Sequence, residues 1–284
     1  MRVSACVGNY AEIPYSVPGL EINVYSVEEL CYCMRENAYL LDTTLVNENL
    51  LKWLEKQCGL RELVKMLYPY VYRKGSLSAF AVTIFQYVGL YDRDKIREIE
   101  QVLKKGAGLS VIEKKKSQVD YLNRKKKYNL ALKGYDDLIA KWEEQTAAGE
   151  LVPAISCLAA IWHNKGVAYV GLMLYDSAAD CFEHAYQLSG DKEYFKAFLA
   201  AKRLSLPEGG YVAFAADYSA QYEHTLELER SWEAFSQEWE QQPEYLMLYN
   251  RREKRAEGNW QQYHADSERQ ALMLKDSYRN SVAE

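Results

Sequence analysis

Proline placement is the feature that most constrains how this chain can fold. More than 80 consecutive residues, between Pro69 and Pro153, contain no proline. Proline breaks a helix interior because it lacks an N–H group and clashes with the preceding turn. Apolar residues in this stretch recur three and four positions apart, which is the spacing of amphipathic helices. The sequence therefore predicts an all-α protein.

The composition narrows the functional class. The chain has 15 glycines and 6 prolines in 284 residues. Their combined share is well below the ~12% of average proteins, which disfavours a turn-rich or disordered chain. A formal net charge of −5 is not typical of a protein that binds nucleic acid or an anionic membrane over its whole surface. We find no 18-residue apolar window and no secretory signal pattern, so we expect no membrane span. The six cysteines are then expected to be reduced thiols in the cytoplasm.

The first 109 residues are expected to form an N-terminal helical region with a small β element. Residues 20–25 alternate apolar and polar side chains, as a half-buried strand does, and residues 3–7 are a second candidate. Ser26 and Glu29 have the spacing of a capping box, in which each side chain accepts from the other's backbone amide. Asn47 is expected to cap the next helix. Further helices are predicted over 61–67, 77–88 and 93–105.

Three glycine–leucine pairs predict the ends of short helices. They are Gly59-Leu60, Gly89-Leu90 and Gly108-Leu109. In such a stop the glycine takes the left-handed conformation and the following apolar residue packs back on the helix. Three of them in 50 residues indicate helices joined by tight turns.

A self-comparison with a shift of 47 residues gives the most informative pattern. Five positions of the first copy align with positions of the same character in the second. In order, they are large, aromatic, alanine, aromatic and apolar. The clearer copy ends at Gly190 and reads Trp162-x3-Gly166-x2-Tyr169-x5-Tyr175-x2-Ala178-x3-Phe182-x2-Ala185.

With these positions the chain resembles the tetratricopeptide repeat family over roughly residues 112–205. The family's 34-residue unit is a pair of antiparallel helices with this order of aromatic and small positions. The resemblance implies that Gly166 and Ala178 allow the two helices to approach closely, and that Phe182 faces the next unit. The first copy departs from the pattern, because Val119 stands where a small residue is expected. The 47-residue spacing requires a longer second helix, which we expect to reach Glu144.

The resemblance also implies a function and a surface. Proteins of this family hold a peptide or helix of a partner protein in a concave groove, so we expect a non-catalytic interaction scaffold for an acidic partner. The chain lacks the full lysine–asparagine–arginine clamp of the family's chaperone-binding members. The residues expected on the inner face of the groove are Lys116, Asp120, Asn123, Arg124, His163, Val167 and Val170.

Residues 207–284 are expected to form a separate long helical hairpin beyond a repeat core at 110–206. Large apolar residues recur at helical spacing on both sides of Gln241-Gln242-Pro243. We predict two helices of about 30 residues, with glutamates on the first arm opposite Arg251, Arg252, Lys254 and Arg255 on the second.

No catalytic or cofactor-binding motif is present in the sequence, so we expect neither an enzyme nor a cofactor. Cys31 and Cys33 are two apart on a predicted helix, which is not a zinc spacing, and no metal site is expected. The alternative function is association with nucleic acid. It rests on nine lysines and arginines between 104 and 127, but they surround the helix instead of forming one stripe, which favours a solvated surface.

Overall fold

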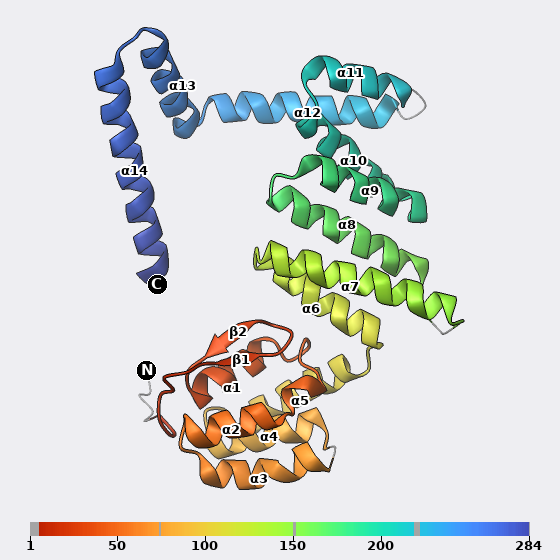
Figure 1. The fold of residues 1–284 in the computed structure, drawn as a ribbon, viewed down its shortest axis with the longest axis vertical. Helices are drawn as coiled ribbons and strands as arrows, with labels where there is room; N and C mark the ends of the chain where they lie inside the picture. The colour runs from red at the N-terminus through yellow and green to blue at the C-terminus, as the bar shows by residue number, and fades with distance from the viewer. Residues whose placement is uncertain (1–5, 74, 150–151, 219–221, 284) are drawn as a thin grey trace. The chain divides into compact units, whose positions relative to one another are not determined.

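The computed structural model describes residues 6–73, 75–149, 152–218 and 222–283, and side chains as far as Arg279. The fold is all-α and repeat-like, with one small two-stranded sheet, as the sequence predicts. The chain divides into two compact units, one ending at Tyr211 and one running from Val212. Within the first unit we distinguish an N-terminal lobe, up to Leu109, from the hairpin stack that follows it (Figure 1).

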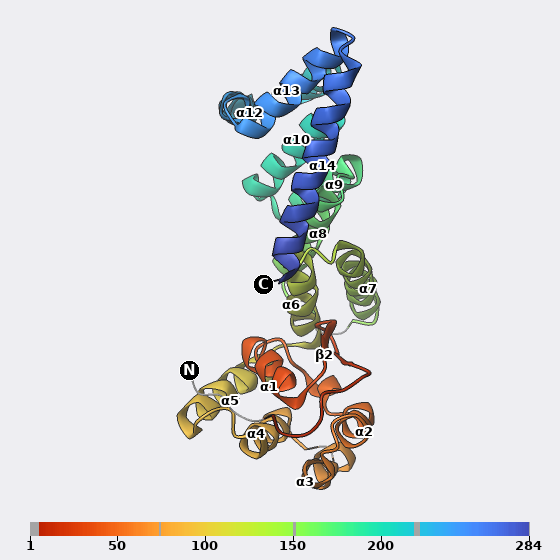
Figure 2. The ribbon, with the colours of Figure 1, turned by 90° about the vertical axis from the view of Figure 1, so that its left-hand side faces the viewer.

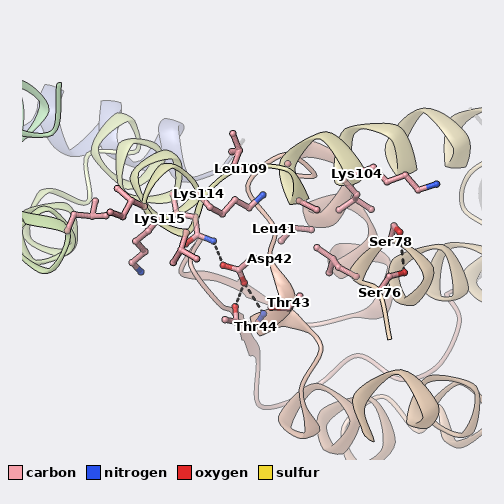
Figure 3. A pocket seen from close by; sticks show the side chains of 18 of the residues that line it. Leu41, Asp42, Thr43, Thr44, Ser76, Ser78, Lys104, Leu109, Lys114 and Lys115 are labelled. Atoms are coloured by element: carbon pink, nitrogen blue, oxygen red, sulfur yellow. Dashed lines mark hydrogen bonds between the residues drawn. The ribbon is translucent and has the colours of Figure 1, made fainter. Parts of the chain in front are cut away.

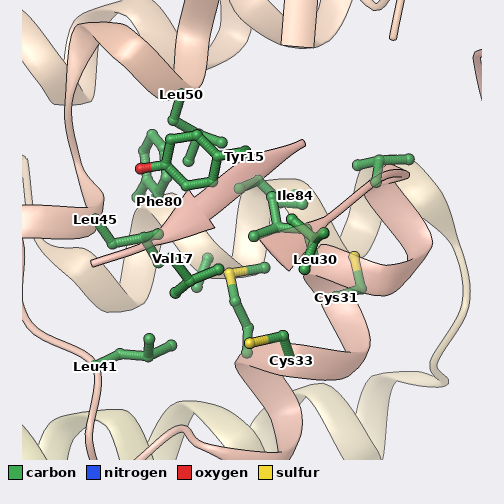
Figure 4. Close-up of a cluster of buried hydrophobic side chains, with 14 of the residues drawn as sticks. Tyr15, Val17, Leu30, Cys31, Cys33, Leu41, Leu45, Leu50, Phe80 and Ile84 are labelled. Atoms are coloured by element: carbon green, nitrogen blue, oxygen red, sulfur yellow. The ribbon is translucent and has the colours of Figure 1, made fainter. Parts of the chain in front are cut away.

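The N-terminal lobe surrounds one hydrophobic core. Strands β1 and β2 pair antiparallel, with Tyr15 opposite Val24, so the expected strand at 20–25 is confirmed in its centre. The expected strand at 3–7 falls mainly outside the described residues, and Cys6 and Val7 are not in a strand. The core gathers Val17, Leu30 and Phe80 from the sheet, the first helix and the fourth (Figure 4). The elements are β1 (Tyr15–Val17), β2 (Ile22–Val24), α1 (Val27–Glu36), the 3-10 turn η1 (Thr43–Leu45), α2 (Glu48–Lys56), α3 (Arg61–Tyr72), α4 (Leu77–Val88) and α5 (Arg93–Ala107).

Most of the predicted helix boundaries in this lobe follow from local hydrogen bonds. Ser26 Oγ accepts from the Glu29 N–H at 3.1 Å, and Asn47 Oδ1 accepts from the Leu50 N–H at 2.9 Å. The Glu29 carboxylate, however, accepts from the Tyr25 N–H at 2.7 Å and not from that of Ser26. The reciprocal half of the capping box is therefore shifted by one residue.

Two of the three predicted glycine stops adopt the left-handed conformation, and the third does not. Gly59 and Gly89 have φ of 73° and 69°. Gly108 has φ −80°, because the last turn of α5 closes through its N–H on the carbonyls of Lys105 and Gly106 without a left-handed residue. Helix α3 also continues to Tyr72, beyond the expected end at 67. Pro69 removes one N–H from the ladder, but its own carbonyl still accepts from the Arg73 N–H.

The hairpin stack is a series of antiparallel helices that pack in sequence order (Figures 1 and 2). Helix α6 contacts both α7 and α8, and α9 contacts both α8 and α10. Helix α7 extends past the expected Glu144 and supplies the longer connection that the 47-residue spacing requires. The bounds are α6 (Val111–Arg124), α7 (Tyr128–Ala147), α8 (Ile155–Gly171), α9 (Tyr175–Ser189) and α10 (Lys192–Ser205).

The turn inside each hairpin repeats residue for residue at the 47-residue shift. Lys126 and Met173 both have positive φ, 58° and 60°. The N–H of the residue after each one bonds to the carbonyl five positions earlier, Lys127 to Leu122 and Leu174 to Tyr169. The internal similarity of the sequence therefore corresponds to a repeated backbone geometry.

The two hairpins achieve close helix packing with glycines on opposite helices. A Cβ atom on Gly166 of α8 would lie 2.6 Å from the Phe182 ring. In the first hairpin the glycine is on the second helix, where a Cβ on Gly134 of α7 would lie 2.6 Å from Val119. Gly134 thus provides the small position that the sequence comparison found missing at Val119. Phe182, which was expected to face the next unit, packs against α8 of its own hairpin.

Three side chains of the stack hold it to the N-terminal lobe. Gln118 Nε2 donates to the Leu40 carbonyl at 3.0 Å and to Asp42 Oδ2 at 2.8 Å. Lys114 donates to the Tyr39 carbonyl, and Lys127 donates to the Glu21 carbonyl. At this joint between the stack and the lobe, most of the hydrogen-bond acceptors are backbone groups.

The C-terminal segment is helical and breaks at the predicted Gln241–Pro243, but its helices are shorter than expected. A second break lies at Glu257–Asn259, where Gly258 has φ 73° and the Asn259 N–H bonds to the Lys254 carbonyl. Two basic residues of α13 contact α14: Lys254 pairs with Asp266 at 2.5 Å, and Arg251 donates to Tyr263 Oη at 3.1 Å. The bounds are α11 (Glu208–Asp217), α12 (Tyr222–Glu240), α13 (Pro243–Ala256) and α14 (Trp260–Ala283). None of the helices in the described residues is both long and apolar enough to cross a membrane.

Candidate functional site

A polar cluster on α6, α7 and α8 contains the first of the expected groove residues. Asp120 is its centre. One carboxylate oxygen pairs with Lys116 Nζ at 2.6 Å, and the other accepts from Tyr135 Oη at 2.7 Å and from Asn164 Nδ2 at 2.8 Å. Three helices thus donate to one partly buried carboxylate.

Tyr135 stays protonated in this cluster. Burial is the main cause that raises the pKa of Tyr135 far above the usual range, and the charge of Asp120 is the second. The hydroxyl is therefore a donor to Asp120 at any physiological pH. Since hydrogen bonds to charged groups are stronger than neutral ones, the cluster fixes the relative position of the three helices.

Asn123 continues the cluster from α6 to α8. Its Nδ2 donates to the Asn164 carbonyl at 2.9 Å. Its Oδ1 atom is buried and has no hydrogen-bond partner among the described residues. An unpaired buried acceptor costs free energy, so this position weakens the hydrogen bonding of the cluster locally.

A shallow cavity of about 360 Å³ opens beside this cluster. Asp120, Asn123, Arg124 and Val167, four of the seven expected residues, line it together. Arg124 is exposed, and so is Lys126, which the turn after α6 carries at the rim. The cavity therefore has a hydrogen-bonded polar wall and two exposed cationic side chains.

The remaining expected residues lie outside the cavity wall. Lys116 is held by Asp120. His163 lies between the rings of Phe182 and Tyr194, at centroid distances of 5.2 and 4.6 Å, and its burial lowers its pKa. Val170 lies in the last turn of α8. The structure thus gathers the expected residues on one side of α6 and α8, but gives several of them internal partners.

The sequence analysis missed Tyr135 and Asn164, which complete the site. Tyr135 occupies an aromatic position of the repeat pattern, equivalent to Phe182, and that pattern does not specify a hydroxyl. Nothing in the sequence marks Asn164, because its partners Asp120 and Asn123 lie more than 40 positions away.

The lysine-rich stretch between 104 and 127 does not form one uniform surface. Lys114 is buried, and Lys104 pairs with Glu100 at 2.6 Å. Lys116 and Lys127 bond to other groups of the chain. Arg124, Lys125 and Lys126 remain together as an exposed group at the turn between α6 and α7.

We see no metal-binding group among the described residues: no three of the histidine, cysteine, aspartate and glutamate side chains gather around a common point. His163 and His184 contact different rings, and His184 packs on Trp162. Cys31 and Cys33 are buried, and burial raises the pKa of Cys33 to about 11. Such thiols are poor nucleophiles at neutral pH.

The comparisons with known proteins add no relative to this description. No protein-family model, no curated protein and no solved structure matches the chain.

Proposed function

We propose that this chain is a non-catalytic scaffold that binds an acidic segment of a partner protein on the α6–α8 side of the hairpin stack. The observation that carries the proposal is the cavity beside Asp120, whose rim holds the exposed cations Arg124 and Lys126. The tetratricopeptide-like character of the hairpins and the cytoplasm as location belong to the same proposal. The six cysteines, none of them in a disulfide, are compatible with a reducing compartment.

The charges at the cavity favour an acidic ligand. Asp120 is already neutralised by Lys116 and hydrogen-bonded by Tyr135 and Asn164, so it repels an anion weakly. Arg124 presents a planar donor fork that suits a carboxylate, and Lys126 adds a second cation. A glutamate or aspartate of a partner would therefore meet two cations.

A panel of fluorescent peptides tests this function directly. We expect glutamate-rich peptides to bind the full chain, measured by fluorescence anisotropy, and lysine-rich peptides of equal length not to bind. Reversing both rim charges with Arg124→Glu and Lys126→Glu should weaken the binding of acidic peptides about tenfold or more, because charge attraction becomes repulsion. The melting temperature should change little, because exposed charges contribute little to stability.

Lys133→Glu is the matched control. Lys133 is exposed on α7 and does not line the cavity, so its reversal changes net charge by as much as either rim substitution alone without touching the site. If Lys133→Glu weakens binding as much as the rim variants, attraction is non-specific and the site is wrong. If a duplex oligonucleotide competes with the peptides and its affinity falls steeply with salt, association with nucleic acid is the favoured function.

A further inference from the structure

A second, larger cavity lies where the hairpin stack meets the N-terminal lobe, and we name it the joint cavity. Its volume is about 640 Å³, within the ~300–1,000 Å³ typical of small-molecule sites. Figure 3 shows it from close by. Its walls are largely aliphatic and come from both sides of the joint: Leu41, Leu77, Leu103, Leu109, Ile112 and Leu138.

One charged group is buried in this apolar surrounding. Lys114 of α6 is only 7% exposed, and it reaches from its helix toward Leu41 (Figure 3). An ammonium group has three N–H donors, and one of them bonds to the Tyr39 carbonyl. The Tyr39 ring lies 5.5 Å from Nζ. Among the described residues, no carboxylate forms an ion pair with Lys114.

The acid whose charge acts on Lys114 is already engaged. Asp42 Oδ2 accepts from Gln118 Nε2, and its Oδ1 accepts from the Thr44 N–H at 2.9 Å. Burial lowers the pKa of Lys114, and Asp42 only partly opposes this effect. A buried ammonium without a counter-ion is costly, so an anion that enters the cavity would be stabilised there.

The other charged residues that line the cavity also favour an anionic ligand. Lys115 and Lys141 also line the cavity, and Asp137 is the only further acid among the described lining residues. Lys104 is partly neutralised by Glu100. The cavity therefore combines an aliphatic interior with a surplus of positive charge among its lining residues.

We propose that the joint cavity binds an amphiphilic monocarboxylate with a medium-length aliphatic chain. The carboxylate accepts from the free donors of Lys114, and the chain lies against the leucines and Ile112. A neutral alkane would leave the ammonium unpaired, and a cationic amphiphile would meet four lysines. This site is separate from the cavity at Asp120, and the proposal does not depend on the peptide-binding function.

Isothermal titration calorimetry of the full chain with decanoate tests the proposal. We expect one saturable site with a dissociation constant below about 1 mM. Ala107 ends α5 in the cavity wall, and its side chain is exposed. Ala107→Trp should therefore fill the cavity without disturbing the core and abolish binding. Lys114→Met keeps the aliphatic stem and should weaken binding about tenfold or more.

Three controls decide between this site and general adsorption. Lys105→Met removes an exposed lysine outside the cavity lining and should leave the affinity unchanged. Decyltrimethylammonium has a chain of equal length and opposite charge and should not bind. Decanoate binding that survives Ala107→Trp, equal binding of the cation, or no decanoate binding would each overturn the proposal. If Lys114→Met fails to fold, Ala107→Trp and the cationic probe still decide it.

Discussion

The two compact units of this chain are both helical, but they bury their apolar side chains to very different extents. In the first unit, Leu54 and Phe85 are completely buried. In the second, α13 has no buried side chain, and Leu248, Leu272 and Leu274 are 51%, 59% and 72% exposed. The first unit is held by its cores, whereas we find no comparable hydrophobic core among the described residues of the second.

This difference indicates where each unit draws its stability. Burying one leucine side chain contributes about 1.5–3 kcal/mol, and most helices in proteins depend on such burial because isolated helices are marginal in water. In the second unit the described contacts between α13 and α14 are polar ones, such as Lys254 with Asp266 and Arg251 with Tyr263.

A matched pair of leucine substitutions gives the largest expected contrast. Leu54→Ala should destabilise the first unit by about 2–5 kcal/mol, because it leaves a cavity in the N-terminal core. Leu274→Ala should change stability by less than about 0.5 kcal/mol, as for surface positions. Urea unfolding followed by circular dichroism measures both. A large cost for Leu274→Ala would show that the second unit has a core of its own.

The hairpin crossings give a smaller effect that tests the internal repeat. Ala131 and Ala178 are completely buried and occupy equivalent positions on α7 and α9. Replacing either by leucine should overpack the crossing and cost about 1–3 kcal/mol. Ala256→Leu on the exposed end of α13 is the control from the other unit and should be near neutral. If only one of the two buried alanines is sensitive, the hairpins do not share their packing.

The smallest expected effect is a pH dependence that is confined to the first unit. Burial lowers the pKa of His163, although Asn164 and Asp191 partly oppose it and Lys116 adds to it. The unfolded chain then binds a proton more readily than the folded one, so this contribution to stability is present above pH ~6.5 and is lost as the pH falls from there through the folded-state pKa. His163→Phe keeps an aromatic ring between Phe182 and Tyr194.

Thermal melting between pH 7.5 and pH 5, values that bracket the ~6.5 of free histidine, checks this expectation. The wild-type melting temperature should fall more on acidification than that of His163→Phe. An equal fall in both proteins would contradict the role of His163 and leave the pH dependence to other groups.

Helix positions in the first unit were predictable because local signals specify them. Leu77–Val88 was predicted with both ends correct, since Ser76 accepts from the Ala79 N–H at its start and Gly89 takes the left-handed conformation at its end. The same kind of signal was overlooked at Gly258. At Gly108 the prediction was wrong, because a glycine can adopt the left-handed conformation but does not have to.

The candidate site was only partly predictable, because its completing contacts are not local. The spacing of Asp120, Asn123 and Arg124 places them on one helix and is visible in the sequence. The donors Tyr135 and Asn164 reach Asp120 only through the packing of α7 and α8 on α6. The joint cavity was not foreseen for the same reason, since Leu41 and Leu138 come from segments almost 100 positions apart.

The polar joint between α6 and the N-terminal lobe has a consequence for how related sequences would vary. Gln118 and Lys127 donate to the carbonyl oxygens of Leu40 and Glu21, and every residue type supplies a carbonyl. Substitutions at 21 would leave the acceptor in place, so no compensating change at 127 is required. Covariation between positions 21 and 127 should therefore be weak, because at this contact the sequence requirement lies on the donor side alone.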